Sequence, residues 1–178
     1  RATIAVQDPQ HGTGHAVQQA EQALADFAGD VLILYGDVPF VSAATMRAML
    51  ERLHADDAPA VVVLGFEPEH ALQYGRVIAR DGRIIGMVEH KDASEEERAC
   101  RLCNSGLMAA RSDVLFALLA RVGNDNAQGE YYLPDIVNIA NADGNVSAVV
   151  VTDDPDEVAG INSRAELAEA EARWQAKR

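Results

Sequence analysis

Apolar positions along the chain fall into short continuous runs and longer stretches with a helical repeat. Residues 31–35 (VLILY) and 60–65 are continuous apolar runs, which are typical of strands buried on both faces of a parallel sheet. Residues 105–110 and 146–151 predict two further strands, and residues 3–6 predict a short one. The chain therefore has enough strand segments for a central sheet.

Three stretches predict helices between these strands. Residues 14–27 place apolar side chains at helical spacing. Ser42 predicts an N-cap for a helix over residues 43–54, because its hydroxyl can accept a hydrogen bond from a backbone N–H of the first turn. Residues 130–142 predict another helix, in which Pro134 must lie in the first turn, where its missing N–H costs nothing.

Serines mark the starts of two more helices. Ser112 predicts the cap of a helix that ends at residue 120. Ser163 and Glu166 match a capping box, which predicts a terminal helix over residues 163–178. We expect this last helix to be the start of a connection toward a part of a longer protein.

A hairpin interrupts the alternation of strands and helices. Asp81-Gly82 predicts a two-residue turn between strands over residues 76–79 and 83–88. Strands that alternate with helices predict an α/β domain with a mostly parallel sheet, to which the hairpin adds an inserted antiparallel portion. We assign residues 1–162 to this one domain.

Length and charge narrow the class of protein. The chain has 178 residues, enough for one domain with a sizeable core. Its net charge of −13 argues against nucleic acid and anionic membranes as partners, because both attract basic surfaces. No apolar run approaches the roughly 20 residues of a membrane span. The two cysteines, Cys100 and Cys103, are too few for a disulfide scaffold or a structural zinc site and favour a reducing compartment, so we interpret their spacing as chance.

Two segments near strand ends carry candidate chemistry. The segment Gly12-Thr13-Gly14-His15 lies between a strand and a helix, where backbone N–H groups favour anions; a simple glycine turn is the alternative. Asp37 follows a buried strand, at the edge where ligands bind in open α/β sheets. Its carboxylate suits Mg²⁺, although it could equally cap the turn before Pro39.

Other polar segments have an ordinary structural interpretation beside a functional one. Glu89 ends a strand before a basic pair, and such charged triplets are usually solvated. Asn104 opens a strand, Tyr131 and Tyr132 stand together near a helix start, and Asn162 is left free beside the capping serine. No nucleophile motif such as G-x-S-x-G is present, so nothing indicates covalent catalysis.

The order of these motifs is more specific than any one of them. Gln7 is followed by HGTGHA, YGDVP, YGR, VEHKDA, NSG, NAQGEYY and GINSR across nearly the whole chain. This series closely resembles the uridylyltransferase domain of the bifunctional bacterial enzymes that make UDP-N-acetylglucosamine. The motifs VEHKDA and NAQGEYY are the most distinctive.

The resemblance implies a Rossmann-like nucleotidyltransferase fold and a reaction. UTP and N-acetylglucosamine 1-phosphate would give UDP-N-acetylglucosamine and pyrophosphate, with Mg²⁺ as cofactor. The product would supply peptidoglycan and lipopolysaccharide synthesis in the cytoplasm. The whole protein would be a homotrimer held by a C-terminal left-handed β-helix acetyltransferase domain.

The resemblance also implies roles for individual residues. Asp37 and Asn162 match the Mg²⁺ ligands, and Asp37 is the position we expect to be catalytic. The positions that match nucleotide contacts are Gln7, Gly12, Thr13, Tyr35, Gly36 and Asp37. The positions that match sugar contacts are Gly75, Glu89, Asn104, Tyr132 and Asn162.

Two departures from the family pattern leave alternatives open. The family's glycine-rich signature with its Arg and Lys is not in this sequence, and Pro134 stands where relatives often carry a hydroxyl. We therefore expect the chain to be incomplete at its N-terminal side. The alternatives are a catalytically inactive nucleotide-sugar-binding module and a nucleotidyltransferase for another sugar 1-phosphate.

Overall fold

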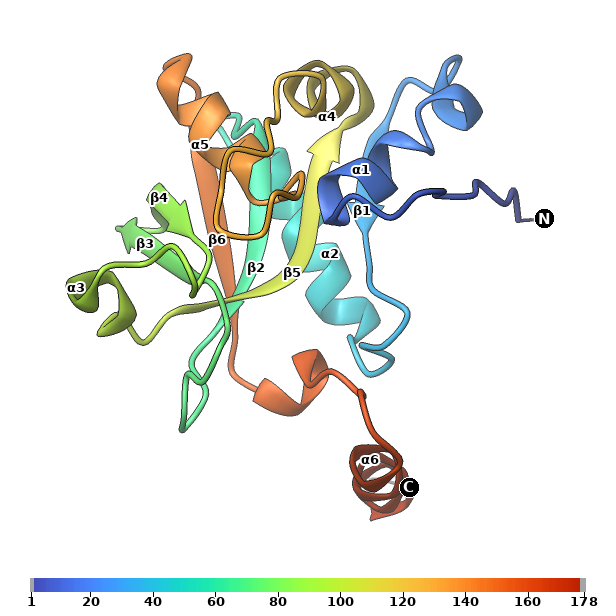
Figure 1. Cartoon of the computed structure of the whole chain (residues 1–178), viewed down its shortest axis with the longest axis vertical. Helices are drawn as coiled ribbons and strands as arrows, with labels where there is room; N and C mark the ends of the chain where they lie inside the picture. The colour runs from blue at the N-terminus through green and yellow to red at the C-terminus, as the bar shows by residue number, and fades with distance from the viewer. Residues whose placement is uncertain (1, 177–178) are drawn as a thin grey trace.

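The computed structural model describes residues 2–176, which form a six-stranded sheet and its covering helices (Figure 1). The strands are β1 (Asp30–Ile33), β2 (Val61–Phe66), β3 (Arg76–Arg80), β4 (Arg83–Val88), β5 (Cys103–Arg111) and β6 (Ser147–Thr152). The α-helices are α1 (Thr13–Gln18), α2 (Ala43–Leu53), α3 (Glu95–Arg98), α4 (Ser112–Leu119), α5 (Asp135–Ala142) and α6 (Arg164–Ala176), and the 3₁₀ helices are η1 (Gln22–Leu24) and η2 (Pro155–Val158).

The sheet has the order β1-β5-β2-β6-β4-β3. Among residues 2–176 only β2 and β6 pair in parallel, and the other pairings are antiparallel. The expectation of a mostly parallel sheet is thus corrected to a mixed one, whereas the α/β class and the antiparallel hairpin are confirmed. The central strands β2 and β5 are buried because helices cover both faces of the sheet. Their continuous apolar runs therefore indicate burial on both faces, and they do not indicate whether neighbouring strands are parallel or antiparallel.

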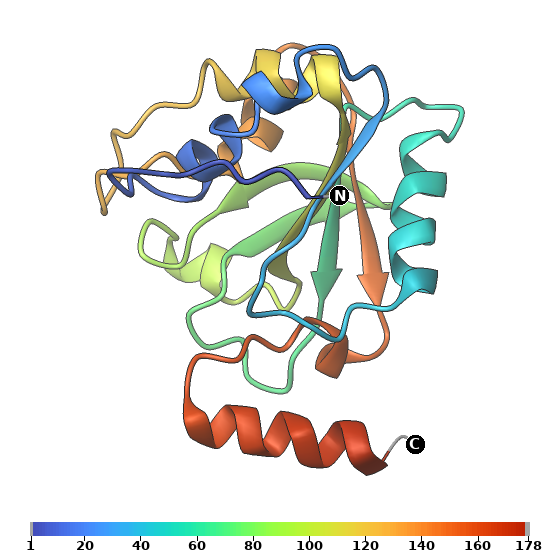
Figure 2. The same cartoon turned by 90° about the vertical axis from the view of Figure 1, so that its right-hand side faces the viewer.

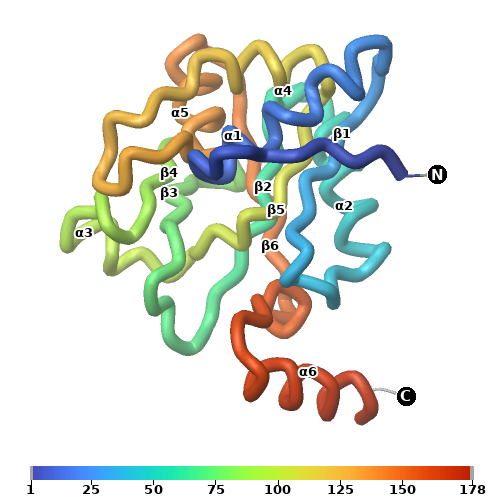
Figure 3. The backbone as a smooth tube through the Cα atoms, turned by 45° about the vertical axis from the view of Figure 1, so that its right-hand side comes forward, coloured from blue at the N-terminus to red at the C-terminus, as the bar shows by residue number. Residues whose placement is uncertain are grey.

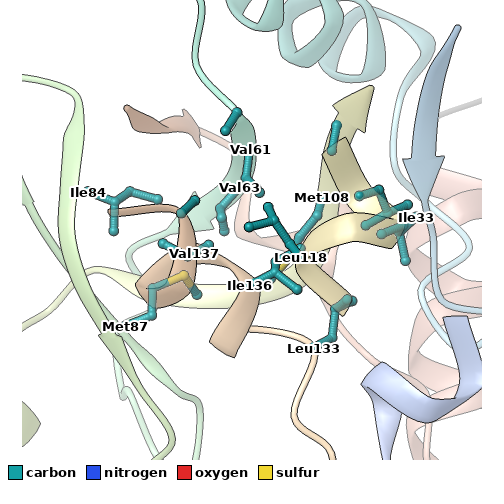
Figure 4. Close-up of a cluster of buried hydrophobic side chains, with 14 of the residues drawn as sticks. Ile33, Val61, Val63, Ile84, Met87, Met108, Leu118, Leu133, Ile136 and Val137 are labelled. Atoms are coloured by element: carbon teal, nitrogen blue, oxygen red, sulfur yellow. The ribbon is translucent and has the colours of Figure 1, made fainter. Parts of the chain in front are cut away.

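Helices lie on both faces of the sheet, with α2 on one face and α1, α4 and α5 on the other (Figures 1 and 2). Strand β2 alternates between the two resulting cores. Val61 and Val63 belong to the cluster with α4 and α5, which Figure 4 shows, and Val62 and Leu64 belong to the cluster with α2. Each fully buried side chain of this size stabilises the fold by about 1.5–3 kcal/mol. The two cores together hold in place the sheet that carries the site.

Two local predictions are confirmed in detail. The Ser42 hydroxyl accepts a hydrogen bond from Thr45 N at 3.1 Å and caps α2. Asp81 and Gly82 have φ values of 51° and 75°. Positive φ at both positions is what a two-residue hairpin turn requires.

The N-terminal predictions are wrong. Residues 3–6 form no strand: Ile4 is 86 % and Val6 74 % exposed, and no described strand pairs with them. The predicted helix over 14–27 breaks after α1, because Gln19 and Ala20 donate to carbonyls three residues back and start 3₁₀ turns.

The run at residues 31–35 is a half-buried edge strand in the described chain, not a strand buried on both faces. Its strand portion, β1, pairs antiparallel with β5 along one side only, and Leu34 is 44 % exposed. Apolar character alone could not show that β1 lacks a second neighbour among the described strands.

Two helix starts also differ from the prediction. Ser112 is the first residue of α4 and not its cap, because its hydroxyl donates to the carbonyl of Phe27 at 2.7 Å. Helix α5 begins at Asp135, five residues later than predicted, since the backbone N–H groups of Tyr131 and Leu133 bond to residues outside the helix. Pro134 occupies the N-cap position.

Helix α6 projects from the end of the sheet and is reached through η2 (Figures 2 and 3). Ser163 caps it by accepting from Glu166 N at 3.2 Å, and the Glu166 carboxylate accepts from Asn162 N at 2.6 Å. An ion pair of 2.6 Å between Arg173 and Asp156 ties α6 to η2. Residues 177 and 178 of the predicted terminal helix lie outside the described residues. Within the described part of the chain no helix has the length and apolar character needed to cross a membrane.

Candidate active site

A cavity of about 280 Å³ lies at the end of β1 and gathers residues that are far apart in sequence. The sequence-predicted residues in its lining are Thr13, Tyr35, Asp37, Gly75, Glu89, Asn104 and Asn162. The fold therefore brings most of the predicted site together in one place.

The ring of Tyr35 is seated on the backbone of Gly106. Gly106 has a φ of +88°, and a Cβ atom there would lie 2.5 Å from the Tyr35 ring. Only glycine fits both the backbone conformation and the contact. Burial raises the pKa of Tyr35, as do the charges of Glu89 and Asp37, while a hydrogen bond with the Thr13 side chain acts in the opposite direction. The phenol is thus a neutral, packed wall of the cavity at physiological pH.

Asp37 and Asn162 lie where the segment after β1 and the segment after η2 come close together. Ile161 N donates to the backbone carbonyl of Asp37 at 2.9 Å, which joins the segment after η2 to the segment after β1. A Cβ atom on Gly160 would lie 3.3 Å from Asn162 Nδ2 and 3.7 Å from Asp37 Oδ2. The two polar side chains therefore share one small region beside Gly160.

This pair has the chemistry of a divalent-cation site. Asp37 offers carboxylate oxygens, and Asn162 offers an amide oxygen when its side-chain amide is turned toward the cation. Hard cations such as Mg²⁺ take oxygen ligands and often keep only one or two protein ligands beside phosphates and water. The part of the chain that the structure describes holds no cluster of three or more His, Cys, Asp or Glu side chains suited to a metal. Asp37 and Asn162 fit a cation that shares its shell with a phosphate ligand.

A second part of the lining is formed by Glu89, Gly75 and Asn104. A Cβ atom on Gly75 would lie 3.3 Å from Glu89 Oε2, so glycine leaves the carboxylate room. Asn104 N donates to Gly75 O at 2.9 Å, and Asn104 Oδ1 accepts from Gly106 N at 2.9 Å. These bonds set the side-chain amide of Asn104 and the carboxylate of Glu89 on one side of the cavity.

Burial raises the pKa of Glu89, and the neighbouring carboxylates of Asp135 and Asp92 raise it further. No hydrogen bond from a described residue reaches the Glu89 carboxylate. A half-buried acceptor without a protein donor is well suited to bind a ligand hydroxyl.

The raised pKa of Glu89 predicts a pH-dependent cost to stability. The folded state holds the proton more tightly than the unfolded state, so this group lowers stability as pH rises above its ordinary pKa. Glu89→Gln should therefore raise the urea midpoint of the ligand-free chain at pH 7. The gain should disappear as the pH falls below about 4, where both side chains are neutral. The exposed control Glu69→Gln should show no gain at either pH, and an equal gain at both pH values for Glu89→Gln would contradict this account.

The loops HGTGHA and NAQGEYY pack against each other. Gly14 N donates to Tyr131 O at 2.8 Å. Cβ atoms on Gly12 and Gly14 would lie 2.8 Å and 2.9 Å from the same carbonyl oxygen, and Gly12 has a φ of +103°. Both glycines are thus explained by the close approach of the Tyr131 backbone. Thr13, between them, accepts from Leu133 N at 3.1 Å and reaches the cavity.

Four predicted residues lie outside the cavity lining, namely Gln7, Gly12, Gly36 and Tyr132. The Gln7 side chain donates to Gly12 O at 2.9 Å and contacts His15 at 3.0 Å, so it braces this loop. Gly36 has no neighbour within 4 Å of a Cβ position. Tyr132 lines an adjoining polar cavity of about 230 Å³, which shares Glu89 with the first.

The lining also includes residues that sequence reasoning missed. Gln73 and Val158 line the cavity and lie in none of the motifs, and Val38 lies within YGDVP but was given no role there. Gly106 stood within the NSG motif, but a sequence gives no sign of the ring that rests on it.

Comparison with known proteins finds relatives that match nearly the whole chain. Residues 2–120 match the MobA-like NTP transferase domain. The chain is 78 % identical over 177 residues to a bifunctional protein GlmU of Novosphingobium aromaticivorans and 73 % identical over 177 residues to that of Sphingopyxis alaskensis. These matches cover 99 % of this chain and 39 % of each relative, so the chain spans well under half of their length.

Solved structures share the fold at low sequence identity. A UDP-glucose pyrophosphorylase complexed with UDP-glucose superimposes with a TM-score of 0.70 at 17 % identity, covering 97 % of this chain and 65 % of the other. A CMP:2-keto-3-deoxy-manno-octonic acid synthetase complexed with CTP gives 0.64 at 15 % identity, covering 93 % and 69 %. At such identities the likeness shows the fold, which is that of nucleotide-sugar transferases. On the sequence match over two thirds of its length and on this fold, the chain belongs to the MobA-like NTP transferase family.

Proposed function

We propose that the chain is the nucleotidyl-transfer part of an enzyme that joins UTP and N-acetylglucosamine 1-phosphate, releasing pyrophosphate. The observation that carries the proposal is the meeting of Asp37, Asn162, Glu89 and Asn104 in one cavity, in a chain 78 % identical to a GlmU protein. A phosphate oxygen of the sugar phosphate would form a bond to the α-phosphorus of UTP while the bond to the β-phosphate oxygen breaks. No protein nucleophile is needed for this displacement.

Asp37 and Asn162 would hold Mg²⁺ on the nucleotide side of the cavity. When bound, the ion would neutralise the negative charge that builds up on the leaving pyrophosphate. The protein's own contribution is to keep the two side chains together through the bond between Ile161 N and Asp37 O. Such preorganisation and charge neutralisation are the main sources of rate in phosphoryl-type transfers.

Glu89, Gly75 and Asn104 would bind the sugar. The Glu89 carboxylate would accept a hydrogen bond from a sugar hydroxyl, and Asn104 can both donate and accept. Tyr132, beside Glu89 in the adjoining cavity, would extend this surface. Pro134 lines the cavity without a hydroxyl, so it offers the sugar no polar contact.

The loop of Gly12 and Thr13, braced by Gln7, would recognise the uracil. Gly12 allows the backbone to approach closely, and Gln7 fixes the loop by its bond to Gly12 O. Tyr35 and Gly36 would lie beneath the nucleotide. For the whole protein we propose a homotrimer in the cytoplasm, held together by the part of the relatives that this chain does not span.

Replacing Glu89 by alanine tests the sugar side. A suitable protein is a chimera in which this chain replaces the matching 177 residues of the Novosphingobium relative. Glu89→Ala should raise the KM for N-acetylglucosamine 1-phosphate about ten- to a hundredfold, because the sugar loses one hydrogen bond to a charged group. The KM for UTP should stay within about twofold, as it should for both substrates in the exposed control Glu69→Ala. A loss confined to UTP would contradict the assigned role.

A further inference from the structure

Arg76 opens β3 and is almost completely buried, with 3 % of its surface exposed. Burying a cation is costly unless other groups replace its water. Among residues 2–176 no carboxylate forms an ion pair with Arg76. The sequence motif YGR gave this arginine no role, and the proposed function does not use it.

Backbone carbonyls take the place of a carboxylate. Arg76 Nη1 donates to Tyr74 O and, at 3.4 Å, to Ala71 O. Nη2 donates to Leu72 O at 3.5 Å, and Nε donates to Arg98 O at 3.3 Å. The planar fork of donors thus fastens the turn over residues 71–74 to the end of α3. A lysine could not reach these acceptors in several directions at once.

The turn that Arg76 holds is strained. Leu72 has a φ of +36°, and its side chain is 71 % exposed, so packing does not compensate for the strain. Tyr74 supplies a second anchor through an edge-to-face contact with Phe66, with ring centroids 4.9 Å apart. Strained backbone persists only where the surroundings over-determine it.

This turn leads directly into the wall of the cavity. Gln73, Tyr74 and Gly75 line the cavity in succession. Gly75 O accepts from Asn104 N at 2.9 Å, and the Gly75 backbone leaves only enough room for Glu89. We infer that Arg76 is a positioning residue that holds the Gln73–Tyr74–Gly75 wall in the shape that binds the sugar phosphate. The inference rests on the proposed function for the identity of the ligand.

The test combines kinetics and hydrogen exchange, both measured on the chimera. We expect Arg76→Lys and Arg76→Met to raise the KM for N-acetylglucosamine 1-phosphate at least tenfold while the KM for UTP changes less than twofold. Amides of residues 71–75 should exchange faster in both variants, and amides of β2 and β5 should keep their protection. Arg80→Met, at the exposed end of β3, is the matched control and should change neither readout.

Two results would overturn the positioning role. One is unchanged exchange at residues 71–75 with unchanged KM values. The other is equal weakening of both substrates together with loss of protection in β2 and β5, which would show a general structural role. The proposed function is tested separately by the unmodified chimera: if that protein uses a different sugar phosphate, faster exchange at residues 71–75 and a raised KM for that sugar still support the role of Arg76.

Discussion

Asp37→Ala should lower turnover in the chimera about a thousandfold or more while leaving the fold intact. A cation at this position contributes several kcal/mol of charge stabilisation, and each 1.36 kcal/mol corresponds to tenfold in rate. Asp37 lies after β1, outside both apolar cores, and its side chain forms no hydrogen bond with another residue of the range 2–176. The measurement is pyrophosphate release at saturating UTP, with circular dichroism and thermal unfolding as the check on folding.

Asp153→Ala is the matched control for this substitution. Asp153 is an exposed carboxylate just after β6 that does not line the cavity, so its loss should leave turnover within about twofold. Near-normal turnover in Asp37→Ala would show that the cation is not held here. Excess Mg²⁺ should rescue Asp37→Asn in part, since the amide keeps one oxygen ligand.

Gly106→Ala should destabilise the chain by about 3 kcal/mol, combining backbone strain with overpacking. Gly106 has a φ of +88°, and the new Cβ would lie 2.5 Å from the Tyr35 ring, so the ring must move out of the cavity wall. Because Tyr35 lines the cavity together with Thr13 and Asp37, we also expect UDP-N-acetylglucosamine to bind at least tenfold more weakly. Urea unfolding and calorimetry measure the two effects.

The control for this prediction is Gly123→Ala. A Cβ there would meet nothing within 4 Å, and the residue has no positive φ, so stability should change by less than about 0.5 kcal/mol. A loss below about 1 kcal/mol for Gly106→Ala, with unchanged binding, would mean that the Tyr35 ring is not fixed by this contact.

Local signals in the sequence were reliable where a few neighbouring residues decide the outcome. The Ser42 cap and the Asp81-Gly82 turn depend on contacts within four residues, and both formed as predicted. Predictions failed where distant residues compete for the same groups. Ser112 bonds to Phe27 instead of capping a helix, and Tyr131 gives its N–H to the loop before α1.

The functional site also separates into residues that the sequence could identify and residues whose role depends on distant parts of the chain. The motif order singled out Asp37, Glu89 and Asn162, and the fold brings these residues into one cavity although they lie far apart in sequence. Arg76 and Gly106 remained hidden, because their importance comes from four carbonyls and a ring that only the folded chain brings near. The direction of strand pairing could not be predicted for the same reason, because a continuous apolar run is compatible with both parallel and antiparallel neighbours.

Pyrophosphate release by the chimera, with UTP, Mg²⁺ and a panel of sugar 1-phosphates, tests whether this chain transfers a uridylyl group to N-acetylglucosamine 1-phosphate. We expect kcat/KM for N-acetylglucosamine 1-phosphate to be at least tenfold higher than for glucose 1-phosphate, and we expect chelation of the metal to stop the reaction. Equal use of both sugars would contradict the sugar assignment of Glu89 and Asn104. No release with any sugar, from a folded chimera that still binds UDP-N-acetylglucosamine, would instead make this chain a nucleotide-sugar-binding module.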